Sequence, residues 1–196
     1  MDSIASITPD DKFVFLDIDG VIATDNALIK MLAKYYGLNG TYFISKEIDK
    51  EIQNAIDTSK LPKPLLNYHY APFCEHAINN IYELQRVTNC KFIISSQWRA
   101  VRTIYQINDL MATKGLYIQF IDKIQDVRPE DDNHSEIIAY YLTEHPKVKN
   151  YVVIDDVESG LEFYHKERYV LTNSSTGFTR DCLEKAVNIL NKDNIV

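Results

Sequence analysis

Two pairs of acidic residues are the part of this sequence whose residue types and spacing point most directly to chemistry. The pairs are Asp17 with Asp19 and Asp155 with Asp156, and each follows a short apolar run. Carboxylates gathered at one place repel one another, and burying them costs free energy unless their charge is compensated. A divalent cation provides that compensation, and a set of oxygen ligands suits Mg²⁺. The two pairs therefore predict a magnesium site.

The first pair also has the spacing that phosphoryl transfer needs. On an extended strand the side chains of Asp17 and Asp19 point to the same side, with Ile18 opposite. Gly20 permits a sharp turn directly after them. One carboxylate can act as a nucleophile and form an acyl phosphate. A second carboxylate two residues away can act as the general acid for the leaving group and then as the base for water.

The apolar runs before the two pairs are typical of buried strands in a parallel sheet, and strands and helices are expected to alternate along the chain. We expect strands at about residues 12–18, 91–95, 116–121, 151–155 and 169–172. We expect helices at about residues 25–36 and 99–113, helices that begin near 133 and 158, and a final helix at 179–191. Both acidic pairs then fall at carboxyl ends of strands, where open α/β sheets bind ligands.

The stretch between the first two expected strands is longer than an ordinary crossover between parallel strands. We interpret residues 38–72 as a small helical insert beside the site, and residues 1–37 and 73–196 as the core. A linker-like Lys-Leu-Pro-Lys-Pro at residues 60–64 lies within the insert. A lid over the active site and a surface excursion with no role in catalysis both fit this stretch.

Composition and charge exclude several classes of protein. With 196 residues, 45% hydrophobic and 25% charged, the chain fits one main globular domain with a small insert. Its net charge of −7 argues against bulk electrostatic attraction to nucleic acid or to anionic membranes. Its three cysteines form no CxxC motif, so we expect neither disulfides nor zinc, and a reducing, cytoplasmic location. We find no signal peptide and no apolar run of about 20 residues, and we expect no membrane association.

The segment at residues 17–21, Asp-Ile-Asp-Gly-Val, resembles the first motif of the haloacid dehalogenase (HAD) superfamily. Four short motifs match in order between about residues 13 and 179. The HAD domains of RNA-repair proteins are the most similar subgroup, because they share a Ser-Ser-x-Trp-Arg stretch, here at residues 95–99, and an Asp-Asp strand end. The resemblance implies an α/β, HAD-like Rossmannoid fold of three layers with a mostly parallel sheet. The helical insert at residues 38–72, which itself resembles nothing in the family, would form a small cap after the first strand.

The resemblance also implies roles for the four acids. Asp17 matches the nucleophile, which is also a magnesium ligand. Asp19 matches the general acid and base, and its backbone carbonyl is a further magnesium ligand. Asp155 matches a direct magnesium ligand, and Asp156 acts through water or supports the other ligands. An Asp at position 19 is typical of the phosphatases and phosphomutases of the family, and not of its dehalogenases or transport ATPases.

The second motif is an apolar strand that ends in Ser or Thr, whose hydroxyl donates to a phosphoryl oxygen. Ser95 fits this position better than Ser96. Arg99 is a candidate for holding a second phosphate or orienting substrate through bidentate contacts, and the alternative is a surface Arg99 beside a core Trp98. Ser96, Arg99 and Gly20 are the candidates for substrate binding.

The third motif of the family supplies a cation, and here the sequence departs from the pattern. The aligned position offers His134, and Arg128 stands six residues earlier. A cation at this place neutralises charge on the phosphoryl group and the nucleophile. His134 does so only when protonated, whereas Arg128, which we favour, is charged across the pH range. Either residue is a candidate for catalysis.

These residues predict a Mg²⁺-dependent phosphomonoester hydrolase that acts through an aspartyl-phosphate on a phosphorylated small molecule or a phosphorylated nucleic-acid end. Three alternatives stay open. The first is an end-processing phosphatase of nucleic acid, which the subgroup suggests and the acidic charge weakens. The second is a phosphotransferase or mutase with the same intermediate. The third is a non-catalytic phosphate-binding module, which only the departure at the third motif supports.

Overall fold

The structure is a computed structural model that describes residues 8, 10–35, 72–100, 102–124 and 134–192. Five strands form one sheet in the order β3-β2-β1-β4-β5, and every neighbouring pair is parallel. The strands are β1 (Lys12–Leu16), β2 (Lys91–Ile94), β3 (Phe120–Lys123), β4 (Asn150–Asp155) and β5 (Tyr169–Leu171). The predicted α/β class with a parallel sheet is confirmed.

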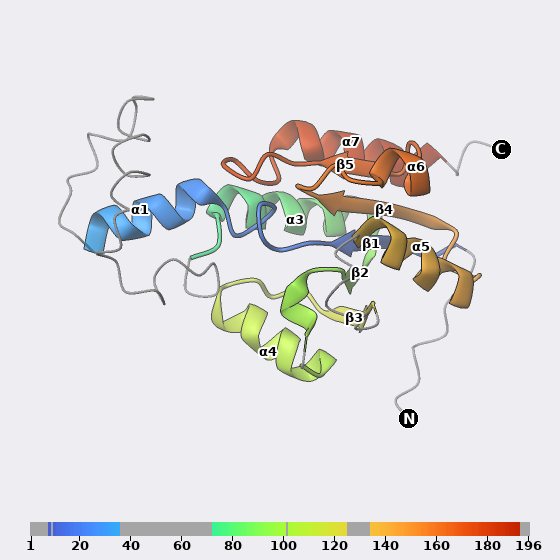
Figure 1. Ribbon diagram of the computed structural model, residues 1–196, viewed down its shortest axis with the longest axis horizontal. Coiled ribbons are helices and arrows are strands. Elements are labelled where there is room, and N and C mark those ends of the chain that lie inside the picture. The colour runs from blue at the N-terminus through green and yellow to red at the C-terminus, as the bar shows by residue number, and fades with distance from the viewer. Residues whose placement is uncertain (1–7, 9, 36–71, 101, 125–133, 193–196) are drawn as a thin grey trace.

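Helices cover both faces of the sheet, so the fold has three layers (Figure 1). The helices are α1 (Asp25–Tyr35), α3 (Glu75–Thr88), α4 (Ile104–Thr113), α5 (His134–Glu144), α6 (Leu161–His165) and α7 (Arg180–Asn191). Buried side chains of α3, α4 and α7 belong to one core cluster, and those of α5 and α6 belong to the other. A short 3₁₀ helix, η3 (Gln97–Arg99), follows β2.

The strand β1 shows why apolar runs, and not alternating patterns, mark this sheet. Its residues Val14 and Leu16 face the cluster of α3, α4 and α7, whereas Phe13 and Phe15 face the cluster of α5 and α6. All four side chains are 0% exposed. A central strand of a sheet that is covered on both faces must be apolar at every position. This burial fixes β1, and with it the acidic pair that follows.

Several expected elements differ from the observed ones. The long helix expected at 99–113 is divided into η3 and α4, because Thr103 caps the N-terminus of α4 in a capping box with Gln106. The strand expected at 116–121 lies at Phe120–Lys123. The helix expected near 158 begins at Leu161.

The helix α3 was not expected from the sequence, although it forms one of the larger contacts of the fold, with α7. Its buried residues Ala77, Ile81, Leu84 and Thr88 follow the spacing of one helical face. That pattern was the available signal. Most of the predicted insert at 38–72 lies outside the described residues, as does the expected start of a helix at Asn133.

Candidate active site

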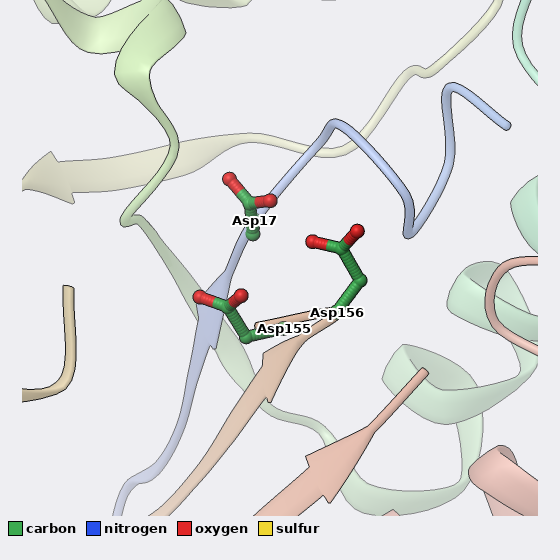
Figure 2. A group of neighbouring side chains, drawn as sticks. All are labelled: Asp17, Asp155 and Asp156. Atoms are coloured by element: carbon green, nitrogen blue, oxygen red, sulfur yellow. The ribbon is translucent and has the colours of Figure 1, made fainter. Parts of the chain in front are cut away.

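Three carboxylates meet at the carboxyl edge of the sheet. Asp17 directly follows β1, Asp155 ends β4, and Asp156 is the next residue. The two strands pair with Leu16 opposite Ile154, and this register brings the acids that follow side by side. Figure 2 shows the three side chains facing one another, and one oxygen of each lies within 4.8 Å of the others. We call these three residues the carboxylate cluster.

Burial makes the charge of the carboxylate cluster costly. Asp17 and Asp155 are 4% and 1% exposed. Burial, and then the charge of Asp155, raise the pKa of Asp17 well above its ordinary value. Burial and the same neighbouring charge raise the pKa of Asp156 to about 6. A set of oxygen donors with this repulsion fits a hard divalent cation such as Mg²⁺, with Asp17, Asp155 and Asp156 as the residues that would hold it.

Gly20 allows the loop after β1 to pass close to the carboxylate cluster. Its φ is +68°, and a Cβ at this position would clash with the carboxyl group of Asp156. Only glycine combines this backbone conformation with the space that Asp156 occupies. The residue that the structure places against Gly20 is Asp156. The predicted contact of Gly20 with substrate therefore stays a prediction.

The same loop is held by a segment from a distant part of the sequence. The Thr172 hydroxyl donates to the Gly20 carbonyl at 3.0 Å, and the Phe178 backbone N–H donates to the Val21 carbonyl at 2.9 Å. A Cβ on Gly177 would clash with that carbonyl of Val21. Residues 172–178 therefore lie directly against the loop that carries the acidic pair.

Asp19 has a different environment from the carboxylate cluster. The indole N–H of Trp98 donates to both carboxylate oxygens of Asp19, with distances of 3.0 Å to each. Burial raises the pKa of Asp19, and the hydrogen bond from Trp98 and the charges of His134 and Lys114 partly offset that rise. Among the described acids, the Asp19 carboxylate is not a member of the group that lies within 4.8 Å.

The turn after β2 supplies the other polar groups of the site. The Ser96 side chain hydrogen-bonds Asp17, and its oxygen accepts from the backbone N–H of Trp98 at 3.4 Å. Ser95 is fully buried, and its hydroxyl has no hydrogen-bond partner within the described part of the chain. Both serines thus lie at the site, and Ser96 is the one that contacts the nucleophile candidate. The predicted donation from Ser95 to a phosphoryl group stays a prediction.

Arg99 is buried at 3% exposure, and its Nη1 donates to the Ser95 carbonyl at 2.8 Å. The alternative of a surface Arg99 is therefore wrong, although the core position of Trp98, which is 1% exposed, is confirmed. Arg99 also lowers the pKa of His134 through its charge, so the guanidinium acts on the site electrostatically.

His134 begins α5 and reaches the carboxylate cluster. Its Nδ1 lies 3.3 Å from Oδ2 of Asp155, and its Nε2 lies 3.4 Å from Nε2 of Gln97. The hydrogen bond to Asp155 raises the pKa of His134, burial opposes that rise, and the charge of Asp17 adds to it. Arg128, the other candidate for the third-motif cation, lies outside the described residues.

Two contacts of the site were not predicted from the sequence, namely Trp98 with Asp19 and Gln97 with His134. The available signal was the position of both residues immediately after the Ser-Ser pair that follows β2. Polar groups that follow a buried strand at the carboxyl edge of a sheet lie near ligands that bind there.

The protein is thus a three-layer α/β protein with acids at the ends of its neighbouring strands β1 and β4. Residues 13–183 match the family described as HAD domain in Swiss Army Knife RNA repair proteins, and the chain belongs to this family. Membership of this family indicates a hydrolase of the haloacid dehalogenase type. The chain is also similar to a solved haloacid dehalogenase-like family hydrolase from Streptococcus pneumoniae, with 14% identity, coverage of 90% of this chain and 91% of that one, and a TM-score of 0.45. None of the curated proteins matches the chain.

No helix within the described ranges has both the length and the apolar character that crossing a bilayer requires.

Proposed function

We propose that this chain is a Mg²⁺-dependent phosphomonoester hydrolase that works through an aspartyl-phosphate on Asp17. One observation carries the proposal: three buried or half-buried carboxylates lie together at the edge of the sheet, while Asp19, which is not a member of this group, accepts a hydrogen bond from Trp98. This arrangement gives one carboxylate the position of a nucleophile beside a cation site and leaves another free for proton transfer.

The reaction has two steps at phosphorus. An oxygen of Asp17 bonds to phosphorus as the bond from phosphorus to the leaving oxygen breaks, and Asp19 gives that oxygen its proton. Asp19 then takes a proton from water, the water oxygen bonds to phosphorus, and the bond to Asp17 breaks to release inorganic phosphate. Bound Mg²⁺ supplies positive charge that offsets the charge of the carboxylates and the phosphoryl oxygens.

The groups around Asp17 have separate tasks in this scheme. The Ser96 hydroxyl orients the nucleophile, because it hydrogen-bonds the Asp17 side chain. The buried Ser95 hydroxyl is a donor for a phosphoryl oxygen. His134, beside Asp155, or Arg128 supplies the remaining positive charge.

A phosphorylated nucleic-acid end is the second candidate substrate, and the family description supports it. The net charge of −7 means that any attraction to a nucleic acid must come from a local group of cations. Preference for a phosphorylated oligonucleotide over the mononucleotide, with a rate that falls as salt rises, would support this substrate. Equal rates on both would favour a phosphorylated small molecule.

The test measures phosphate release from an aryl phosphate, with and without Mg²⁺, for the wild type and for Asp17→Asn. We expect magnesium-dependent release that Asp17→Asn abolishes. Asp181→Asn on the outer helix α7 makes the same change at an exposed acid and should leave the rate unaltered. Undiminished activity in a clean Asp17→Asn preparation would exclude the mechanism. Transfer to an added alcohol without free phosphate would instead indicate a phosphotransferase.

A further inference from the structure

One short turn of the chain serves both acids of the first pair. We call residues 96–99 the donor turn. Its Ser96 side chain hydrogen-bonds Asp17, and the indole N–H of Trp98, two residues later, donates to Asp19. The spacing of the two donors thus matches the spacing of the two carboxylates, and each donor serves one acid.

The indole of Trp98 is fixed in place by its surroundings. Its ring packs against Phe73 with a centroid distance of 5.8 Å, and Nζ of Lys114 lies 5.4 Å from its centre. The backbone carbonyl of Trp98 accepts a hydrogen bond from Nη1 of Arg102 at 3.0 Å. A side chain that is 1% exposed and held on these sides cannot turn its N–H away from Asp19 without disturbing the core.

The chemistry of the indole suits a carboxylate that must stay out of a metal site. An indole nitrogen is a hydrogen-bond donor only, so it can neither bind a cation nor accept the proton that Asp19 carries. It is also neutral, and it therefore adds no charge beside the cluster. The N–H engages both oxygens of Asp19, which are otherwise suitable ligands for the cation that the neighbouring acids would hold.

We propose that Trp98 is a positioning residue that holds the carboxylate of Asp19 outside the metal site and directs it for proton transfer. The catalytic part of this role rests on the function proposed above. Without the N–H, the carboxylate of Asp19 turns toward the carboxylate cluster and joins the ligands of the cation. The acid and base of the reaction is then lost while the cation stays bound.

The first test is Trp98→Phe, which keeps an aromatic ring and removes the donor. We expect kcat for an aryl phosphate to fall about 10- to 100-fold with little change in KM, because a proton-transfer group is misplaced. The half-saturating Mg²⁺ concentration should stay the same or fall. A merely structural role predicts a weaker metal site, and a rise in that concentration would overturn the proposal.

Phe73→Leu is the matched control, since it loosens the packing of the indole and leaves its N–H in place. We expect its loss in kcat to be clearly smaller than that of Trp98→Phe. An equal loss in the two variants would mean that packing, and not the hydrogen bond, is what the site requires.

The second test reports the contact without any assay of activity. Trp98 is the single tryptophan of the sequence, so the protein labelled with ¹⁵N gives one indole N–H signal. Asp19→Ala, which removes the acceptor, should shift this signal and speed its exchange with solvent, whereas Asp181→Ala should not. An unchanged signal in Asp19→Ala would overturn the proposal even if Trp98→Phe fails to fold. If Asp19→Ala shifts the signal but the wild type has no phosphatase activity, the contact is confirmed, and the catalytic role is rejected together with the proposed function.

Discussion

The two sides of the candidate site differ in how their charges are satisfied. On the side of β1 and β4, the carboxylate cluster is buried or half-buried, and burial together with the charge of Asp155 raises the pKa values of Asp17 and Asp156. On the side of β2, the donor turn already meets its acids with hydrogen bonds from Ser96 and Trp98. Under the proposed function a bound cation would offset the charge of the first side, whereas the second side obtains its hydrogen bonds from the protein itself. Binding and positioning would then fall to different strands of one sheet.

The largest expected effect comes from a direct comparison of the two sides. Asp17→Asn should lower phosphate release by at least about a thousandfold, because no other group can take the place of the nucleophile. Ser96→Ala should lower it by only about tenfold, since it removes one orienting hydrogen bond from Asp17 and leaves the nucleophile in place. Steady-state kinetics with an aryl phosphate separates the two. Equal losses would remove the distinction between the sides.

Asp155→Asn tests the cation side alone. The fully buried Asp155 is the acid at the end of β4, and we expect its loss to raise the Mg²⁺ concentration needed for half activity by about 10- to 100-fold. Asp156→Asn should raise it less, because Asp156 is expected to act through water. Magnesium titrations of activity, or calorimetry of Mg²⁺ binding, give the order. If Asp156→Asn raises the required Mg²⁺ concentration more than Asp155→Asn does, Asp156 is the direct ligand and Asp155 acts through water.

Gly20→Ala should destabilise the protein by about 1–3 kcal/mol, because the added methyl group clashes with the Asp156 carboxyl group in a backbone conformation that disfavours alanine. Gly115→Ala is a matched control, since φ is +86° there and no atom lies within 4 Å of the added Cβ. It isolates the cost of the backbone conformation. Urea denaturation of both variants measures the difference, and equal destabilisation would show that Asp156 yields to the methyl group.

The smallest expected effect concerns stability without metal. In the absence of Mg²⁺, Asp17→Asn should raise the free energy of unfolding by about 1 kcal/mol, because it removes a buried charge that Asp155 repels. Added Mg²⁺ should stabilise the wild type more than this variant. Thermal or urea unfolding with EDTA and with Mg²⁺ makes the measurement. A metal-free variant that is less stable than the wild type would show that the cluster is not strained.

The parts of this molecule that could be predicted from the sequence are those that depend on neighbouring residues. The run before Asp17 is apolar because β1 is covered on both faces, and its acids follow at the strand end. The family resemblance built on these segments is confirmed. The roles of the individual site residues stay predictions.

Contacts between distant parts of the chain could not be predicted. The indole of Trp98 meets Asp19 across 79 positions of sequence, and only the packing of η3 against the core brings them together. The helix α3 is a different case, because its buried residues do have the spacing of one helical face. The sequence just before α3 contains no recognisable motif, so nothing there marks where the helix begins. The local sequence pattern therefore places each acid at the end of its strand, whereas tertiary packing determines which residues surround it.

The hydrogen bonds from residues 172–178 to the loop after β1 have a consequence for how that loop forms during synthesis. The ribosome makes Gly20 early, but its hydrogen-bond partner Thr172 follows 152 positions later. Until then the loop that carries the acidic pair lacks its cover, and the carbonyl of Val21 lacks the N–H of Phe178. A chain that extends only as far as β4 therefore cannot form these two hydrogen bonds, and the loop that carries the acidic pair gains them only once residues 172–178 have been made.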